Sequence, residues 1–209
     1  LLIYATVFRH IIQAPPSPGD PSGLDSFALW LLCGLLPWAF FSMATSSGMR
    51  SVVENAGLVR KVWFPREVLV VGAVGALQVT FFIELGLLVV TLLIAGNMVL
   101  PWLPVLLLVL AMLFVFTVGI TLTLAAAFVS FRDLSHLWGV VIQAGFYAAP
   151  VIFPIALLEG KANNIPYRIV QFNPITVFIG AIRNTLYDLR MPPGLDLLYL
   201  LGWSTGAFA

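Results

Sequence analysis

Residues Leu103 to Phe116 read LPVLLLVLAMLFVF, fourteen positions without a polar side chain. The run lies inside a longer apolar stretch, from Trp102 to Val129, which exceeds the roughly 20 residues that a helix needs to span a bilayer. Its polarity does not alternate from residue to residue, as a strand of a membrane β-barrel would require. The stretch therefore predicts a helix that crosses a membrane and satisfies its own backbone hydrogen bonds.

The composition of the whole chain extends this prediction. Of the 209 residues, 61% are hydrophobic and only 9% are charged, whereas an average soluble domain is about 25% charged. With a mean hydropathy of +1.04, the chain is predicted to be an all-α, polytopic helical membrane protein. Its net charge of +1 gives no field that would attract nucleic acid, which we exclude as a partner. The single Cys33 offers neither a disulfide nor a cysteine metal cluster.

The order of apolar stretches and breaks predicts a single transmembrane domain over residues 1–209. Residues 13–26 carry four prolines and two glycines, so we expect a surface loop there. Residues 157–193 are expected to form two short helices at or in one interface, the second from about Ile175 to Leu189. We predict six spans, the first and the last truncated by the ends of the chain, at about 1–12, 27–47, 68–95, 102–129, 137–153 and 194–209.

Two polar connectors, residues 48–67 and 130–136, must lie on the same side of the membrane if the spans alternate. Short cytoplasmic loops carry an excess of Lys and Arg. The two sides hold five cations each, so the count leaves the orientation open, and only the density of cations near residue 60 favours a cytoplasmic side for the connectors. The two sets are Arg50, Arg60, Lys61, Arg66 and Arg132 on the connector side and Arg9, Lys161, Arg168, Arg183 and Arg190 on the other.

The first connector contains the densest charge, GLVRKVWFPRE from Gly57 to Glu67. Four apolar residues recur at i, i+1, i+4 and i+5, which predicts one apolar stripe on a short helix that Pro65 ends. Such an element can lie on the membrane surface or insert into a groove of a partner. The simpler alternative is a set of charged anchors that flank two spans. The stripe consists of Leu58, Val59, Val62 and Trp63.

Several short motifs follow one another in an order that resembles the permease subunits of type 2 ABC exporters. The resemblance runs from about Leu29 to Leu189 and is strongest to the subgroup that exports polysaccharides, O-antigen and teichoic acid polymers across bacterial plasma membranes. The motifs are LPW-x-FF at Leu36 to Phe41, GLVRKVWFPRE at Gly57 to Glu67, SFRDLSH at Ser130 to His136, YAAPVIFP at Tyr147 to Pro154 and FNP at Phe172 to Pro174.

The resemblance implies that this chain forms the membrane part of a transporter and that separate subunits bind ATP. The first connector would be a coupling helix that docks in a cleft of a cytoplasmic ATPase, and residues 130–136 would add a smaller contact in which Arg132 and Asp133 can pair. Two ATPase subunits would bind ATP and Mg²⁺, because this chain has no G-x-x-x-x-G-K-[ST] loop. The permease would work as a homodimer without a cofactor, metal or catalytic residue of its own, and so would not be an enzyme. The predicted coupling residues are Leu58, Val59, Arg60, Lys61, Val62, Trp63, Phe64, Pro65, Arg66, Glu67, Arg132 and Asp133.

Aromatic residues and one acid in the spans are candidates for the translocation pathway. Flat rings can stack on the C–H faces of sugars, although helix packing or an interfacial aromatic belt would also explain each ring. Glu84 lies about 24 Å along the third span. An acid at that depth indicates a pathway or a subunit contact, or else a snorkelling or protonated structural residue. The candidates are Trp38, Phe40, Phe41, Phe81, Phe82, Glu84, Phe146 and Tyr147.

Prolines interrupt the end of the fifth apolar stretch and the segment that follows it, where a straight helix should fail. Broken helix at membrane depth requires cover from protein or a water-filled cavity. The segment resembles the re-entrant outer gate helices of polymer exporters, and a re-entrant turn capped by proline is the structural alternative. The predicted outer-gate residues are Pro150, Pro154, Asn173 and Pro174.

These features together predict a multi-pass permease of the bacterial plasma membrane, in contact with membrane lipid. Its function would be ATP-driven export of a lipid-linked glycan or a related cell-envelope polymer. Two alternatives stay open at this point: a type 2 exporter of drugs, peptides or lipids, and an intramembrane enzyme.

Overall fold

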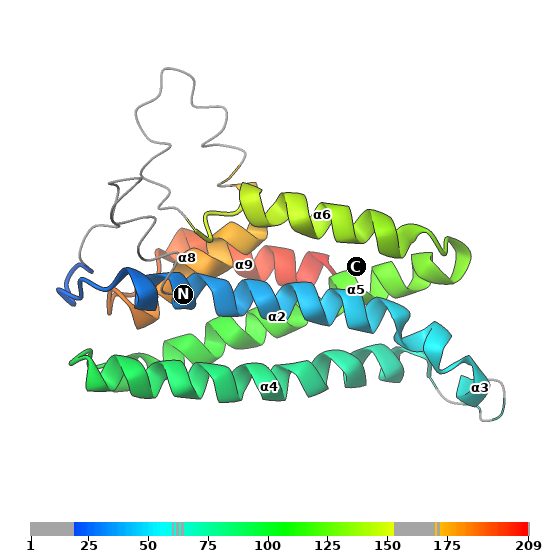
Figure 1. The fold of residues 1–209 in the computed structure, drawn as a ribbon, viewed down its shortest axis with the longest axis horizontal. Coiled ribbons are helices and arrows are strands. Elements are labelled where there is room, and N and C mark those ends of the chain that lie inside the picture. Colours follow the sequence, from blue (N-terminus) through cyan, green and yellow to red (C-terminus); the bar gives the residue numbers. More distant parts are fainter. Residues whose placement is uncertain are drawn as a thin grey trace, which may run out of the picture.

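The protein is helical in the part of the chain that the computed structural model describes, residues 19–59, 61, 63, 65–152, 170 and 172–208 (Figure 1). Three long helices, α2 (Phe27–Glu54), α4 (Glu67–Ile94) and α5 (Leu103–Ser130), have 28 residues each. At 1.5 Å per residue, each is about 42 Å long. All three are long and apolar enough to cross a membrane. The predicted all-α membrane fold is therefore confirmed.

The predicted second, third and fourth spans begin and end within one residue of these helices, except at the end of α2. There the helix continues past residue 47, through Arg50, to Glu54. The added segment, GMRSVVE, contains three polar side chains but no proline. Polarity alone does not end a helix, so α2 extends out of its apolar zone before the chain turns at Asn55.

Three helices of intermediate length follow: α6 (Leu134–Ala148), α8 (Pro174–Leu186) and α9 (Gly194–Gly206). They overlap the predicted fifth span, second gate helix and sixth span. The described residues also contain the one-turn helix α3 (Ala56–Val59) and a 3-10 helix, η2 (Leu100–Trp102). With 15 residues, α6 is about 22 Å long, less than the bilayer core of about 30 Å. The predicted first span, residues 1–12, lies outside the described residues.

Helix α2 runs through the middle of the bundle. In Figure 1, α4 lies along one side of α2 and α6 along the other, and α5 crosses behind it. Aromatic side chains fill these contacts. Phe40 stacks on Phe81 of α4 with ring centroids 4.8 Å apart, and Phe41 stacks on Phe116 of α5 at 5.8 Å. Because α2 also contacts α8, it joins both ends of the molecule.

The three long helices come close together at Gly48 of α2. A Cβ atom at this position would overlap the methyl group of Thr121 on α5 and lie 3.3 Å from Val74 on α4. The Thr121 side chain is buried, and its hydroxyl donates to the carbonyl oxygen of Thr117, which fixes its rotamer. The close packing of α2 against α5 and α4 therefore requires glycine at residue 48.

We expect Gly48→Ala to lower the melting temperature of the purified full-length protein in detergent. Alanine has the higher helix propensity by about 1 kcal/mol, but a methyl group forced into a filled contact costs about 1–3 kcal/mol. Gly72→Ala on α4 is the matched control, because a Cβ atom there meets nothing within 4 Å. It should leave the melting temperature unchanged or raise it. Equal melting temperatures for the two variants would contradict the close approach of α2 and α5.

Candidate coupling connector and outer gate

The connector between α2 and α4 contains a shorter helix than the sequence predicts. Helix α3 (Ala56–Val59) has four residues, Lys61 lies in a turn, and Trp63 lies outside any helix. The prediction of one helix that continues to Pro65 is therefore wrong. The β-branched valines of the segment add little helix propensity of their own, and Pro65 lies six residues beyond the end of α3.

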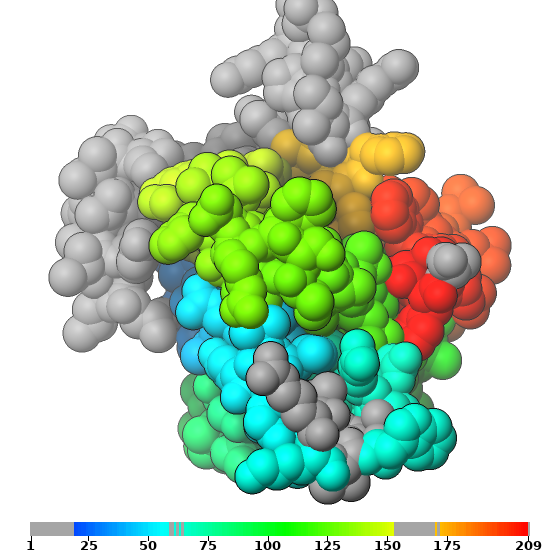
Figure 2. All heavy atoms as spheres, turned by 90° about the vertical axis from the view of Figure 1, so that its right-hand side faces the viewer, coloured from blue at the N-terminus to red at the C-terminus, as the bar shows by residue number. Residues whose placement is uncertain are grey.

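The tip of this connector exposes large side chains. Trp63 is 96% exposed and Leu58 is 48% exposed, and Lys61 and Pro65 also lie at the surface. In Figure 1, α3 projects past the other helices, and Figure 2 looks directly onto this end. An exposed indole beside a cation is available to a partner or to the membrane surface. Three predicted coupling residues, and the side chain of Val59, lie outside the described part of the chain: Arg60, Val62 and Phe64.

The second connector, residues 131–133 between α5 and α6, lies at the same end of the molecule. A cavity of about 260 Å³ lies at this end, and residues of α2, α5 and α6, including His136, line it. The two connectors therefore share one end, as the alternation of spans predicts. Arg132 and Asp133 form no ion pair with each other. The guanidinium carbon of Arg132 lies instead 5.9 Å from the centre of the Phe128 ring.

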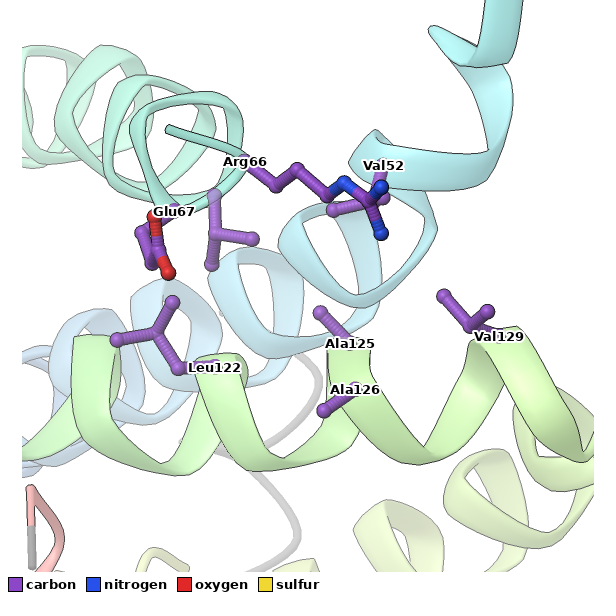
Figure 3. A pocket seen from close by; sticks show the side chains of 8 residues that line it. Val52, Arg66, Glu67, Leu122, Ala125, Ala126 and Val129 are labelled. Atoms are coloured by element: carbon purple, nitrogen blue, oxygen red, sulfur yellow. The ribbon is translucent and has the colours of Figure 1, made fainter. Parts of the chain in front are cut away.

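A cavity of about 330 Å³ lies at the base of the first connector, between α2, α4 and α5 (Figure 3). Its lining is apolar apart from Arg66 and Glu67. In Figure 3 the Arg66 guanidinium reaches over Val52 of α2, whereas the Glu67 carboxylate points toward Leu122 of α5. Neither side chain forms a hydrogen bond or ion pair within the described ranges. Both are therefore available to a ligand or partner.

The opposite end of the bundle is organised around Arg183 of α8. Its Nη1 and Nη2 atoms donate hydrogen bonds to the carbonyl oxygens of Pro150 and Val151, at 2.6 and 2.7 Å. Its guanidinium carbon lies 3.6 Å from the centre of the Trp30 ring on α2. The missing side chain of Gly34 leaves the space that the guanidinium occupies. One buried cation thus joins α8, α2 and the segment after α6.

A count from the sequence places Arg183 among the five cations on the side opposite the connectors, but it is not available there as a surface charge. The residue is only 7% exposed and lies on the inward face of an amphipathic helix. Helix α6 ends at Ala148, so the carbonyl groups that follow have no helical partner, and the guanidinium supplies donors for two of them. Without Arg183 and without Arg50, which lies in α2, each side keeps four cations, so the count still leaves the orientation open.

The beginning of α8 contains two of the predicted outer-gate residues. Pro174 is its first residue, and Asn173 caps it through Oδ1, which accepts a hydrogen bond from the Ile175 N–H at 3.1 Å. Pro150 is buried where the chain leaves α6. Pro154 lies outside the described residues. The structure brings the other three to the same end of the bundle, and their role as a gate stays a prediction.

The end of α8 is attached to two other parts of the chain. The buried side chain of Asn97, after α4, donates to the carbonyl oxygen of Leu186 at 2.8 Å. The Tyr187 hydroxyl donates to the carbonyl oxygen of Leu24 at 2.6 Å, just before α2. Beyond these contacts, burial raises the pKa of the Asp188 carboxyl, and the neighbouring Arg190 cation partly offsets this effect. Sequence reasoning missed Asn97, which reads as an ordinary residue of a polar turn.

The predicted pathway residues divide between the interior and the surface of the chain. Four are buried in the contacts of α2 with its neighbours, and Phe146 lies half-buried with its ring 5.9 Å from that of Trp38. Three are exposed, on α4 and α6. The pathway role of all eight stays a prediction. The buried four are Trp38, Phe40, Phe41 and Phe81, and the exposed three are Phe82, Glu84 and Tyr147.

Comparisons with known proteins relate this arrangement to transporters. The family described as ABC-2 type transporter matches residues 1–187, a range that includes every described helix from α2 to α8. The O-antigen export system permease protein RfbA of Myxococcus xanthus is 26% identical over 201 residues, which cover 96% of this chain and 73% of that protein. Two Klebsiella pneumoniae proteins with the same name are 24% and 22% identical. Their alignments cover 95% and 97% of this chain and 71% and 74% of the relatives.

We expect Arg183→Met to lower the stability of the full-length protein by about 2–4 kcal/mol, because it leaves two buried carbonyl oxygens without a donor. The control is Arg190→Met, which removes a cation whose side chain is 56% exposed and should change stability by less than about 1 kcal/mol. Thermal unfolding in detergent measures both.

Gly34→Ala tests the same contact without removing the charge. A Cβ atom at this position would overlap the Arg183 guanidinium, so this variant should also melt at a lower temperature than the unmodified protein. If Gly34→Ala and Arg183→Met both melt like Arg190→Met, the guanidinium does not hold these three segments together.

Proposed function

The chain belongs to the ABC-2 type transporter family as an integral, multi-pass membrane protein, and from this premise we propose that it is the permease of an ATP-driven exporter in the bacterial plasma membrane. The proposed cargo is a lipid-linked polysaccharide or a related cell-envelope polymer. The three relatives that support this cargo are all named O-antigen export system permease proteins. Their names favour a glycan over drugs, peptides or small lipids.

The observation that carries the proposal is the exposed tip of the first connector. The Trp63 ring is almost fully exposed, and a cation, Lys61, lies two residues before it. An aromatic and cationic tip that extends past the bundle suits insertion into a groove of a partner. We propose that the partner is a cytoplasmic ATPase, present in two copies on a homodimer of permeases. It would bind ATP and Mg²⁺ and hydrolyse the nucleotide, so that no covalent chemistry takes place in this chain.

The proposed mechanism uses α2 and α4 as continuous rods. Closure of the two ATPases would displace the connector, which is attached directly to the end of α2 and the start of α4. Because α2 contacts both α6 and α8, a displacement of one end reaches the segments of the outer gate at the other. A pathway would then open between the two permeases.

The surface residues among the pathway candidates would act directly in this mechanism. Phe82, Glu84 and Tyr147 lie on the exposed sides of α4 and α6, where a second permease or the polymer can reach them. The buried rings would act by positioning α2. The proposal keeps six spans in one transmembrane domain, of which α2, α4 and α5 supply three.

We expect the double substitution Lys61→Glu and Trp63→Glu to release the ATPase from the full-length permease, because both changes oppose insertion of the tip into a groove of the partner. Co-purification of the permease with the proposed partner ATPase, co-expressed with it, measures the interaction. Recovery of the ATPase should fall by about tenfold or more, the effect of losing one interface anchor worth about 1.4 kcal/mol or more.

The matched control is Leu100→Glu with Arg190→Glu, which changes one exposed apolar residue and one exposed cation at the other end of the bundle. It should leave the ATPase bound. If the connector variant folds, retains the ATPase and still supports export, the tip is a membrane anchor and the proposed coupling role is wrong.

A further inference from the structure

The start of α8 lies near the middle of the bundle rather than at one of its ends (Figure 1). Phe178 of α8 packs against Phe116 with ring centroids 5.5 Å apart, and Phe116 is the fourteenth of the 28 residues of α5. The end of α8 points toward the end of the bundle opposite the connectors, where Asn97 binds the Leu186 carbonyl group. Pro174, four residues before Phe178, therefore lies up to about 6 Å further toward the connectors. The chain thus breaks before α8 at membrane depth.

This break leaves the Phe172 carbonyl group without a helical donor. Asn173 has an extended backbone with a ψ of 116°, as expected for the residue before a proline. In a continuous helix the Thr176 N–H would donate to the Phe172 oxygen, but here it donates to the Asn173 oxygen, at 3.0 Å. The hydrocarbon core contains no water that could replace this donor, so an unpaired carbonyl group is costly at this depth.

Tyr199 of α9 supplies the missing donor. Its hydroxyl donates a hydrogen bond to the Phe172 carbonyl oxygen. The rings of Phe172, Tyr199 and Trp203 also pack edge to face, with each pair of centroids between 6.2 and 6.4 Å apart. Helix α9 is itself bound to α5, because the Ser204 hydroxyl donates to the Met112 carbonyl oxygen at 2.9 Å. The start of α8 is therefore attached to α5 through α9.

The two ends of α8 are held unequally. Near its end, Arg183 donates two hydrogen bonds, and Asn97 and Tyr187 connect the following residues to the parts of the chain after α4 and before α2. At its start, the Tyr199 hydroxyl is the one side chain of another helix that forms a hydrogen bond within the described ranges. The residue that accepts it, Phe172, is 69% exposed. The start is thus the end of α8 that can separate from its neighbours with the loss of one hydrogen bond.

A buried hydroxyl group adds to this inequality. Thr176, in the first turn of α8, is only 6% exposed, and its hydroxyl has no hydrogen-bond partner in the described part of the chain. Thr185, near the end of the same helix, is also buried, but its hydroxyl donates to the Ala181 carbonyl oxygen at 2.7 Å. Burial of a hydroxyl without a partner is unfavourable. The packed position of the start of α8 therefore carries a cost that the position of its end does not.

We propose that Tyr199 is the positioning residue for the start of α8. Its hydrogen bond to the Phe172 carbonyl oxygen holds this end of the helix against α9, and the start moves away from α9 when the bond breaks, while Arg183 keeps the other end attached. The start of α8 would then be the moving part of the outer gate, a step that rests on the proposed function. The positioning of α8 by Tyr199 requires neither the proposed cargo nor the proposed ATPase.

Hydrogen–deuterium exchange of the full-length protein in detergent tests this proposal in two peptide fragments, residues 173–178 at the start of α8 and 182–187 at its end. Tyr199→Phe keeps the ring and removes the hydroxyl. It should speed exchange in the first fragment by about tenfold, the effect of losing one hydrogen bond of ordinary strength, and leave the second fragment unchanged. Thr176→Val removes the unpaired hydroxyl and should slow exchange in the first fragment, because the packed position no longer buries that group.

Thr205→Val is the matched control on the same helix as Tyr199. The Thr205 hydroxyl donates to the carbonyl oxygens of Leu201 and Gly202, both in α9, so its removal should change exchange in neither fragment. If Tyr199→Phe speeds exchange equally at both ends of α8, the residue contributes only to general stability. If it does not speed exchange at the start, the hydrogen bond does not hold that end. Either result would overturn the proposal.

Release of carboxyfluorescein from proteoliposomes separates this proposal from the proposed function. If the start of α8 closes the pathway, Tyr199→Phe should release the trapped dye faster than the unmodified protein and the Thr205→Val control do. Faster exchange at the start of α8 without faster dye release would support the positioning role of Tyr199 and contradict only the role of α8 as a gate.

Discussion

The end of the bundle opposite the connectors depends on the hydrogen bonds that Arg183 donates to the carbonyl oxygens of Pro150 and Val151. A helix that breaks inside a membrane leaves backbone groups without partners, at a cost of several kcal/mol each. A guanidinium has enough donors to satisfy two carbonyl groups at once. The Trp30 ring stabilises the face of the same cation. These contacts of Arg183 stabilise the break in the chain after α6, which would otherwise be unfavourable.

Helix α2 connects the contacts of Arg183 with the connector at the other end of the bundle. Trp30 and Gly34, which surround the guanidinium, lie in its first turns, and Val52 lies beside Arg66 in its last one. Pro37 lies within the same helix and cannot donate a backbone hydrogen bond, which leaves one carbonyl group of the preceding turn free. This interruption of the α2 hydrogen bonds lies one turn from Gly34, beside the Arg183 guanidinium.

Apolar length predicted α2, α4 and α5 to within a residue at most of their ends, because a helix is the only open structure that satisfies its backbone in lipid. The same reasoning could not place Arg183, whose burial depends on carbonyl groups 33 and 32 residues away in the chain. Nor could it extend α2 to Glu54 or end α3 at Val59, because local backbone preference decides both. Whether an aromatic side chain faces the interior or the surface depends on how the helices pack. The sequence therefore could not predict that Trp38 is buried and that Tyr147 is exposed.

The two ends of the bundle use charge in opposite ways. At the connector end, the side chains of Lys61, Arg66 and Glu67 have no partner in the described ranges, which costs little where water and lipid headgroups are near. At the outer end, a buried cation is committed to two internal hydrogen bonds. The connector end can therefore move or bind partners without losing internal hydrogen bonds, whereas separation of α8 from the end of α6 requires Arg183 to release both carbonyl groups. Arg183 thus restrains the end of the bundle where α8 meets the end of α6.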